Sequence, residues 1–139
     1  MPSAGDEVLS MKMLEAPTAD APSIYVVDDE PSLTDLYTSL LEATGYNVSP
    51  FHDRAEALAA LEEDGDKPDL LITDYRGLSI PIGWFMLQCL AVHPTLRILM
   101  ASGFEQRELQ FCIVRPDRFI QKPFTGEAFL EEVKAALAA

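Results

Sequence analysis

The sequence predicts an α/β fold, a doubly wound parallel sheet in which five strands alternate with five helices. Short apolar runs recur along the chain, and such runs are typical of strands buried on both faces of a parallel sheet. Between them lie segments whose apolar residues follow the helical period and are bounded by turn residues. A length of 139 residues fits one domain with a single substantial core.

The chain opens with residues 1–22, a segment rich in Ala, Pro, Ser and acidic residues that we expect to form a mobile extension. A folded domain is expected over residues 23–139. Its first strand covers residues 24–27, and the helix after it begins near Pro31, since proline suits the first helical position. Gly45 is typical of the end of this helix. The apolar residues that follow the helical period are Leu33, Leu36, Tyr37, Leu40 and Leu41.

The remaining elements continue the alternation. Asp53 and Glu56 are spaced as a capping box for the second helix, and Thr125 is suited to cap the last one. Proline or glycine residues separate several of the segments. The expected strands are residues 46–51, 70–73, 96–101 and 119–121, and the expected helices lie from about 55 to 61, from 83 to 92, between Glu105 and Phe111, and after 125.

Polar residues follow four of the expected strands. Asp28 and Asp29 follow the first strand, Asp74 follows the third, Ser102 follows the fourth, and Lys122 follows the fifth. The carboxyl ends of parallel strands share one edge of a sheet, and open α/β sheets build their sites at that edge. Carboxylate oxygens are the ligands that Mg²⁺ prefers. We therefore expect a site for a divalent cation and a phosphoryl group.

In these segments the chain resembles the receiver domain of two-component response regulators. The resemblance covers about residues 23–137, and it rests on four segments taken together and in order. It implies the flavodoxin-like strand order 2-1-3-4-5, which brings the first and third strands side by side. The matching segments are residues 24–30 (IYVVDDE), 70–76 (LLITDYR), 98–103 (ILMASG) and 119–124 (FIQKPF).

The resemblance implies a phosphorylation site with a Mg²⁺ cofactor. Asp74 is the implied phosphoacceptor. Asp29 and Asp74 are the implied direct metal ligands, Asp28 acts directly or through water, and the backbone carbonyl of Arg76 completes the set. Without a cation, clustered carboxylates repel one another and raise a pKa.

The resemblance also implies a switch. Lys122 pairs with the phosphoryl oxygens, Ser102 turns inward to hydrogen-bond them, and Phe119 is the aromatic residue that turns inward with Ser102. The implied output is a population shift at the face formed by the fourth helix, fifth strand and fifth helix.

The implied partners are a sensor histidine kinase or a histidine phosphotransfer protein and an unidentified downstream protein. Such a receiver, stand-alone or part of a larger protein, catalyses only its own phosphorylation and dephosphorylation. A formal net charge of −13 with scattered basic residues argues against direct nucleic-acid binding. The sequence has no apolar run of about 18 residues for membrane insertion and no secretory signal, so we expect a cytoplasmic protein.

Simpler explanations exist for each residue alone. Asp28 and Asp29 could cap the following helix, Lys122 could belong to an ordinary loop, Ser102 to a turn, and Phe119 to the core. A different function is a Mg²⁺-dependent phosphatase resembling haloacid dehalogenases. The Asp-x-Asp motif of those enzymes does not match residues 28–30, and turnover of a phosphomonoester would favour this function. A third is a degenerate receiver, against which the intact phosphoacceptor and lysine argue.

One segment departs from the receiver pattern. Receivers commonly place proline four residues after the phosphoacceptor, where this chain has Leu78, so residues 77–82 resemble a one-residue insertion. The insertion bears on the geometry of the Arg76 carbonyl. Arg76 and Phe104 occupy the two positions that flank the approach of hydrolytic water in receivers. We expect slow self-dephosphorylation, and faster loss of the phosphoryl group in Phe104→Glu.

Overall fold

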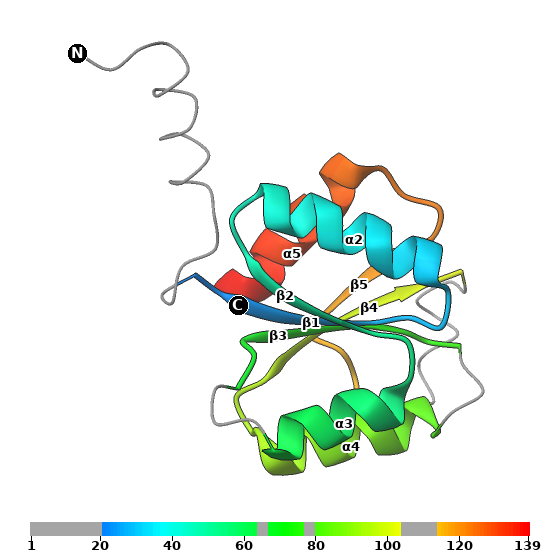
Figure 1. The fold of residues 1–139 in the computed structure, drawn as a ribbon, viewed down its shortest axis with the longest axis vertical. Coiled ribbons are helices and arrows are strands. Elements are labelled where there is room, and N and C mark those ends of the chain that lie inside the picture. Colours follow the sequence, from blue (N-terminus) through cyan, green and yellow to red (C-terminus); the bar gives the residue numbers. More distant parts are fainter. Residues whose placement is uncertain (1–20, 64–66, 77–79, 104–113) are drawn as a thin grey trace.

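The computed structural model describes residues 21–63, 67–76, 80–103 and 114–139. In these residues five parallel strands form one sheet in the order β2-β1-β3-β4-β5 (Figure 1). This confirms the predicted fold class and strand order. The strands are β1 (Ser23–Val27), β2 (Asn47–Phe51), β3 (Leu70–Asp74), β4 (Arg97–Ser102) and β5 (Arg118–Gln121).

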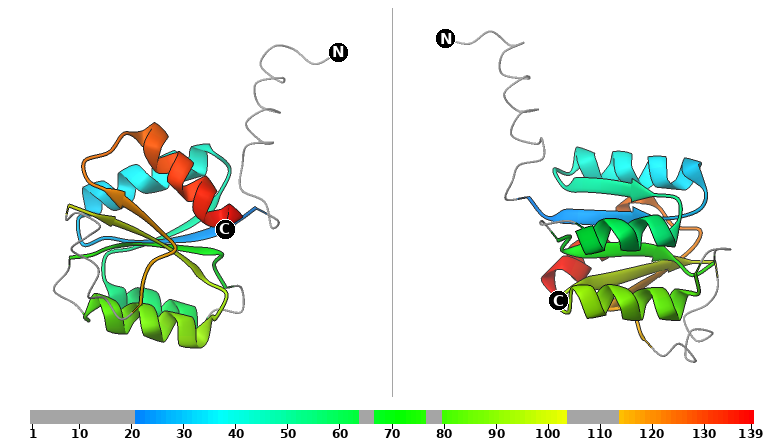
Figure 2. Two further views of the ribbon diagram at one scale, coloured as in Figure 1. Left: turned by 180° about the vertical axis from the view of Figure 1, so that it is seen from behind. Right: turned by 60° about the horizontal axis from the view of Figure 1, so that its bottom comes forward.

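Helices cover both faces of the sheet. Helices α2 (Pro31–Ala43) and α5 (Gly126–Ala138) lie on one face, and α3 (Arg54–Glu63) and α4 (Ile82–Val92) lie on the other (Figures 1 and 2). The helix predicted between Glu105 and Phe111 lies outside the described residues, as do residues 1–20 of the predicted extension. Among the helices that the structure describes, none is long and apolar enough to cross a membrane.

Local signals in the sequence start and stop these helices as expected. Helix α2 begins at Pro31 and is closed by Gly45, whose φ of 98° lies in the left-handed region that glycine tolerates. The N–H groups of Gly45 and Tyr46 donate to the carbonyls of Glu42 and Leu41, the pattern of a Schellman motif. At α5 the Thr125 hydroxyl accepts from the backbone N–H of Ala128, which confirms the predicted cap.

The sheet divides the core into two apolar clusters. On the α3 and α4 face, Tyr25 and Leu71 from neighbouring strands pack beside Phe85. On the α2 and α5 face, Tyr37 and Phe129 stack with ring centroids 4.8 Å apart. In the register of β1 against β3, Ile24 pairs with Leu70 and Val27 with Thr73, and alternate side chains of each strand enter the two clusters. The ends of β1 and β3 are thereby held level.

One apolar residue of the helical pattern in α2 is not buried in the core. Leu36 follows the helical period of α2, but its side chain is 51% exposed, whereas Tyr37 and Leu41 are fully buried. The sheet and α5 cover a stripe of α2 that is narrower than its apolar face, so Leu36 lies beyond the edge of the core.

Candidate functional site

Three carboxylates meet at the carboxyl edge of the sheet. Val27 of β1 pairs with Thr73 of β3, so the residues that follow, Asp28 and Asp74, are neighbours across the two strands. Each of Asp28, Asp29 and Asp74 offers an oxygen, and these oxygens lie within 4.8 Å of one another. Asp28 is buried, Asp74 is half-buried, and Asp29 is exposed. The structure therefore brings together the three predicted carboxylates.

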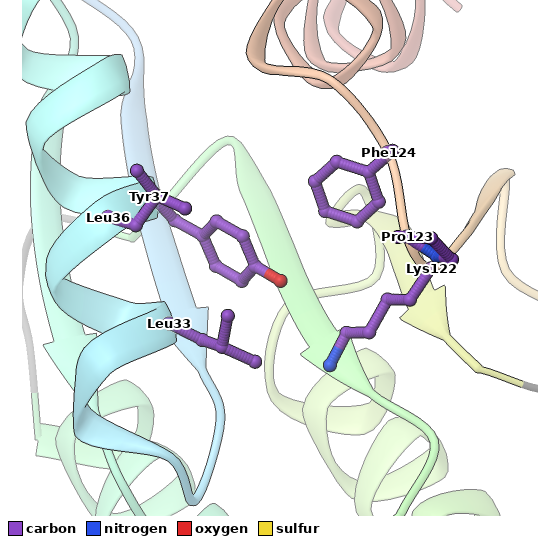
Figure 3. Close-up of a pocket in the computed structure, with 6 residues that line it drawn as sticks. All are labelled: Leu33, Leu36, Tyr37, Lys122, Pro123 and Phe124. Atoms are coloured by element: carbon purple, nitrogen blue, oxygen red, sulfur yellow. The ribbon is translucent and has the colours of Figure 1, made fainter.

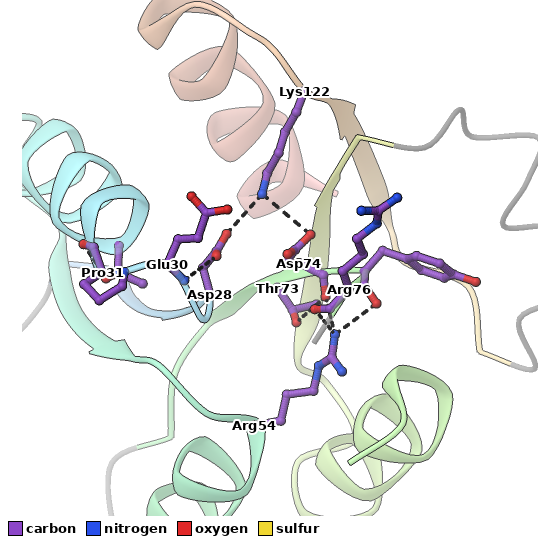
Figure 4. A network of polar contacts seen from close by, with 10 residues as sticks. Asp28, Glu30, Pro31, Arg54, Thr73, Asp74, Arg76 and Lys122 are labelled. Atoms are coloured by element: carbon purple, nitrogen blue, oxygen red, sulfur yellow. Dashed lines mark hydrogen bonds and ion pairs between the residues drawn. The ribbon is translucent and has the colours of Figure 1, made fainter. Parts of the chain in front are cut away.

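Lys122 bridges two of these acids. Its Nζ lies 3.1 Å from Oδ2 of Asp28 and 3.6 Å from Oδ1 of Asp74 (Figure 4). The backbone N–H of Lys122 donates to the carbonyl of Ser102 at 2.7 Å, and this bond aligns the ends of β4 and β5. Ser102 itself is fully buried. The predicted lysine and serine thus lie at the same sheet edge as the acids.

The protein environment disfavours a negative charge on Asp74. Burial is the main cause that raises the pKa of this carboxyl, and the carboxylates of Asp28 and Asp29 raise it further. The ammonium of Lys122 and a hydrogen bond from the Arg76 backbone act in the opposite direction. A divalent cation would remove the mutual repulsion, and hard carboxylate oxygens are its preferred ligands. The donor set therefore fits Mg²⁺.

Asp28 also has a structural role. Its Oδ1 accepts the backbone N–H of Glu30 at 3.0 Å, which fixes the turn between β1 and α2. Glu30 occupies the N-cap of α2 and makes no side-chain capping bond. Asp28 therefore does not cap α2, because its bond reaches the N–H of the N-cap residue and not one of the first helical turn, and its second oxygen remains directed at Lys122.

Sequence reasoning missed Arg54. This first residue of α3 is only 4% exposed, and its guanidinium donates to the backbone carbonyls of Asp74, Tyr75 and Arg76 (Figure 4). It also donates to the carbonyl of Ile80. One signal could have found it. A cation in the first turn of a helix opposes the helix dipole, and such a conflict with a local rule is expected at functional or strained sites.

The other predicted residues lie at or near the same edge, or outside the described residues. Phe119 is partly buried and packs against the apolar cluster on the α3 and α4 face, as a core aromatic would. Arg76 is an exposed residue, and its backbone carbonyl accepts a hydrogen bond from Arg54. Leu78 and Phe104 lie outside the described residues, so the expectations that rest on them stay predictions.

An apolar pocket of about 420 Å³ adjoins Lys122 (Figure 3). It lies between α2 and the segment that joins β5 to α5. Tyr37 lines this pocket, and burial is the main cause that raises the pKa of its hydroxyl above the ordinary value. The carboxylates of Asp28 and Asp74 raise this pKa further, so the hydroxyl stays protonated. The pocket is lined by Leu33, Leu36, Tyr37, Lys122, Pro123 and Phe124.

Known proteins share this sequence pattern. The family model of the response regulator receiver domain matches residues 24–134. The regulatory protein VanRc of Enterococcus gallinarum is 31% identical over 116 residues, covering 82% of this chain and 49% of that protein. The transcriptional regulatory protein CpxR of Escherichia coli (strain K12) is 33% identical over 116 residues, covering 82% of this chain and 48% of CpxR. The chain spans about half the length of these two relatives.

Solved structures share the fold. A CheY-like response regulator receiver domain protein from Methanospirillum hungatei JF-1 has a TM-score of 0.77 at 23% identity, covering 86% of this chain and 95% of that one. A response regulator receiver protein from Sinorhizobium medicae WSM419 has a TM-score of 0.77 at 27% identity, covering 88% and 98%. Because the family model matches most of the sequence, the chain belongs to the response regulator receiver domain family.

Proposed function

We propose that this receiver domain is a Mg²⁺-dependent switch that accepts a phosphoryl group on Asp74. The observation that carries the proposal is the convergence of Asp28, Asp29 and Asp74 with the ammonium of Lys122 at the ends of three strands. Aspartates also serve in proteins as acceptors for nearby backbone N–H groups, as Asp28 does for Glu30. Here, in addition, one oxygen from each of the three carboxylates lies within 4.8 Å of the others. Such a site is suited to bind a cation and a phosphoryl group.

The donor in this proposal is a sensor histidine kinase or a histidine phosphotransfer protein. An oxygen of the Asp74 carboxylate forms a bond to phosphorus while the P–N bond of a phosphohistidine breaks. The imidazole nitrogen leaves with the electron pair and takes up a proton. Phosphoryl transfer depends mainly on positioning and on charge stabilisation. Lys122 supplies a positive charge within reach of the phosphoryl oxygens, since it already contacts Asp74 at 3.6 Å.

In the metal site of this proposal, Asp28, Asp29, Asp74 and the Arg76 carbonyl hold Mg²⁺. The bound ion would offset the carboxylate charges and those of the phosphoryl oxygens. It would also favour the ionised form of Asp74, which this half-buried carboxylate needs in order to act as a nucleophile.

The switch in this proposal is read by a downstream protein. Ser102 and Lys122 are joined through the backbone where β4 and β5 end, so contacts made with a phosphoryl group act directly on β5 and α5. Phe119 lies on β5 and is partly buried, and it responds to the same change. Receivers work by shifting a population between two such arrangements.

Intact-mass spectrometry after incubation with Mg²⁺ and acetyl phosphate tests the proposal. The wild-type protein should gain one phosphoryl group, and Asp74→Asn should gain none, because the amide keeps the shape of aspartate but lacks the anionic nucleophile. Asp117→Asn, at the opposite edge of the sheet, is the matched control and should be phosphorylated like wild type. Phosphorylation of Asp74→Asn at the wild-type rate would contradict the proposal. Multiple turnover of a phosphomonoester would favour a phosphatase.

A further inference from the structure

Arg54 occupies an unusual place for an arginine. It lies in the first turn of α3, where the helix dipole disfavours a cation, and it is almost fully buried. Desolvation by burial lowers the pKa of Arg54 from its ordinary value, while the carboxylates of Asp74 and Asp29 act to raise it. The local sequence does not favour this arrangement, so contacts elsewhere must stabilise it.

Within the described residues, the guanidinium donates to backbone carbonyls around the proposed phosphorylation site. Nη2 lies 2.7 Å from the carbonyl of Asp74, 3.0 Å from that of Tyr75 and 2.7 Å from that of Arg76. Nη1 donates to the carbonyl of Ile80 at 3.0 Å. The two hydrogens of Nη2 are shared among three oxygens. One planar group thus links the end of β3 (Figure 4) to the backbone just before α4.

One of these carbonyls belongs to the metal site of the proposed function. A carbonyl oxygen has two lone pairs, so the Arg76 oxygen can accept a hydrogen bond from Arg54 and still offer a lone pair to a cation. We propose that Arg54 is a positioning residue that holds the Arg76 carbonyl for the cation and thereby sets the Mg²⁺ affinity of the protein. This inference rests on the proposed function.

The guanidinium has two opposing effects on Mg²⁺. Its hydrogen bonds hold the carbonyl in place, which favours binding because a fixed ligand need not be ordered when the ion arrives. Its positive charge lies near the carboxylates, which disfavours binding. Holding the carbonyl is the larger effect in this proposal. Substitutions that separate charge from geometry can test this ranking.

Arg54→Lys keeps the positive charge but replaces the planar fork with a single ammonium, which cannot serve Ile80 and the end of β3 together. Arg54→Met loses both the charge and the hydrogen bonds. We expect isothermal titration with Mg²⁺ to show weaker binding in both variants, by about tenfold for Arg54→Lys. The titrations are made at a temperature at which circular dichroism shows every variant to be folded, so a loss of stability alone does not change the result.

Arg97 at the start of β4 provides matched controls, because Arg97→Lys and Arg97→Met make the same chemical changes at the opposite edge of the sheet. Both should bind Mg²⁺ like wild type. Wild-type affinity in Arg54→Lys, or tighter binding in Arg54→Met, would overturn this inference alone. Absence of Mg²⁺ binding by the wild-type protein would overturn the proposed metal site and this inference with it.

A measurement on the wild-type protein covers the case in which the variants do not fold. The guanidinium N–H signals of Arg54 in nuclear magnetic resonance spectra should shift during a Mg²⁺ titration, because in this proposal the cation and the guanidinium share the Arg76 oxygen. The midpoint of this shift should agree with the midpoint of binding measured by calorimetry. The guanidinium of Arg118, which pairs with Glu132 far from the site, should not shift. Arg54 signals that stay unmoved while Mg²⁺ binds would overturn the inference.

Discussion

The two edges of the sheet use aspartate in different ways. At the amino edge, Asp69 and Asp117 each lie just before a strand, and each accepts a backbone N–H from a neighbouring strand. The N–H of Ser23 donates to Asp69 at 2.8 Å, and that of Ile98 donates to Asp117 at 2.7 Å. At the carboxyl edge, Asp28 accepts the N–H of Glu30 in its own loop, and one oxygen from each of Asp28, Asp29 and Asp74 lies within 4.8 Å of the others.

The difference shows what distinguishes a candidate site from a structural acid. An aspartate that accepts an N–H from the next strand helps to hold the sheet together and needs no further partner. Aspartates that face one another repel, and they require a cation or a proton. Lys122 supplies a positive charge at the carboxyl edge, but it contacts two of the three carboxylates. A candidate cation site is therefore indicated by carboxylates that lie close to one another, and not by the number of acidic residues at an edge.

The largest expected effect concerns Lys122. Lys122→Ala should slow phosphorylation by acetyl phosphate about a hundredfold, because a positive charge aimed at the transferring group is lost. It should not weaken Mg²⁺ binding, since the ammonium repels the ion. Lys134→Ala, on an exposed position of α5, makes the same charge change away from the site. Rates followed by intact mass should separate the two variants, and equal rates would contradict a role for Lys122 in transfer.

The second largest effect is on Mg²⁺ affinity, and it compares an aspartate of the carboxyl edge with one of the amino edge. Asp29→Ala should weaken Mg²⁺ binding about tenfold or more. A carboxylate a few ångströms from a cation contributes at least about 1 kcal/mol of binding free energy, even at a protein surface. Asp69→Ala removes the same charge from the amino edge and should leave Mg²⁺ affinity unchanged. Isothermal titration of both variants is the measurement. Equal affinities would mean that Asp29 is not a metal ligand.

The smallest expected effect is on stability, and it has opposite signs at the two edges. Without divalent cations at neutral pH, Asp74→Asn should be more stable than wild type, because burial and neighbouring acids disfavour the ionised carboxylate. Asp117→Ala should be less stable by about 1 kcal/mol, because the Ile98 N–H loses its acceptor. Thermal unfolding followed by circular dichroism measures both changes.

The pH dependence of this effect follows from the raised pKa of Asp74. Because the folded-state pKa lies above that of the unfolded chain, wild type loses stability as pH rises through the folded-state value. Asparagine does not titrate. The advantage of Asp74→Asn should therefore be present at neutral pH and should disappear as pH falls below both pKa values. An advantage that persists unchanged in acid would show that it does not come from ionisation.

Much of the fold was predictable because it depends on neighbours along the chain. Apolar runs and helical periods predicted the alternation, and Pro31, Gly45 and Thr125 predicted where helices begin and end. The direction of parallel strands predicted which edge each acid would occupy, which is why Asp28, Asp74 and Lys122 were expected together. The resemblance to receivers supplied the strand order and the assignment of roles.

Only the tertiary structure decided the surroundings of particular side chains. Leu36 and Tyr37 are adjacent in the same helical pattern, but the position of the sheet and α5 leaves one exposed and buries the other. Arg54 reads as a surface residue in its local sequence. The carbonyls that hold it come from residues 20 to 26 positions away. Propensity acts between residues close in sequence, whereas burial of a charge depends on partners that only the folded chain brings together.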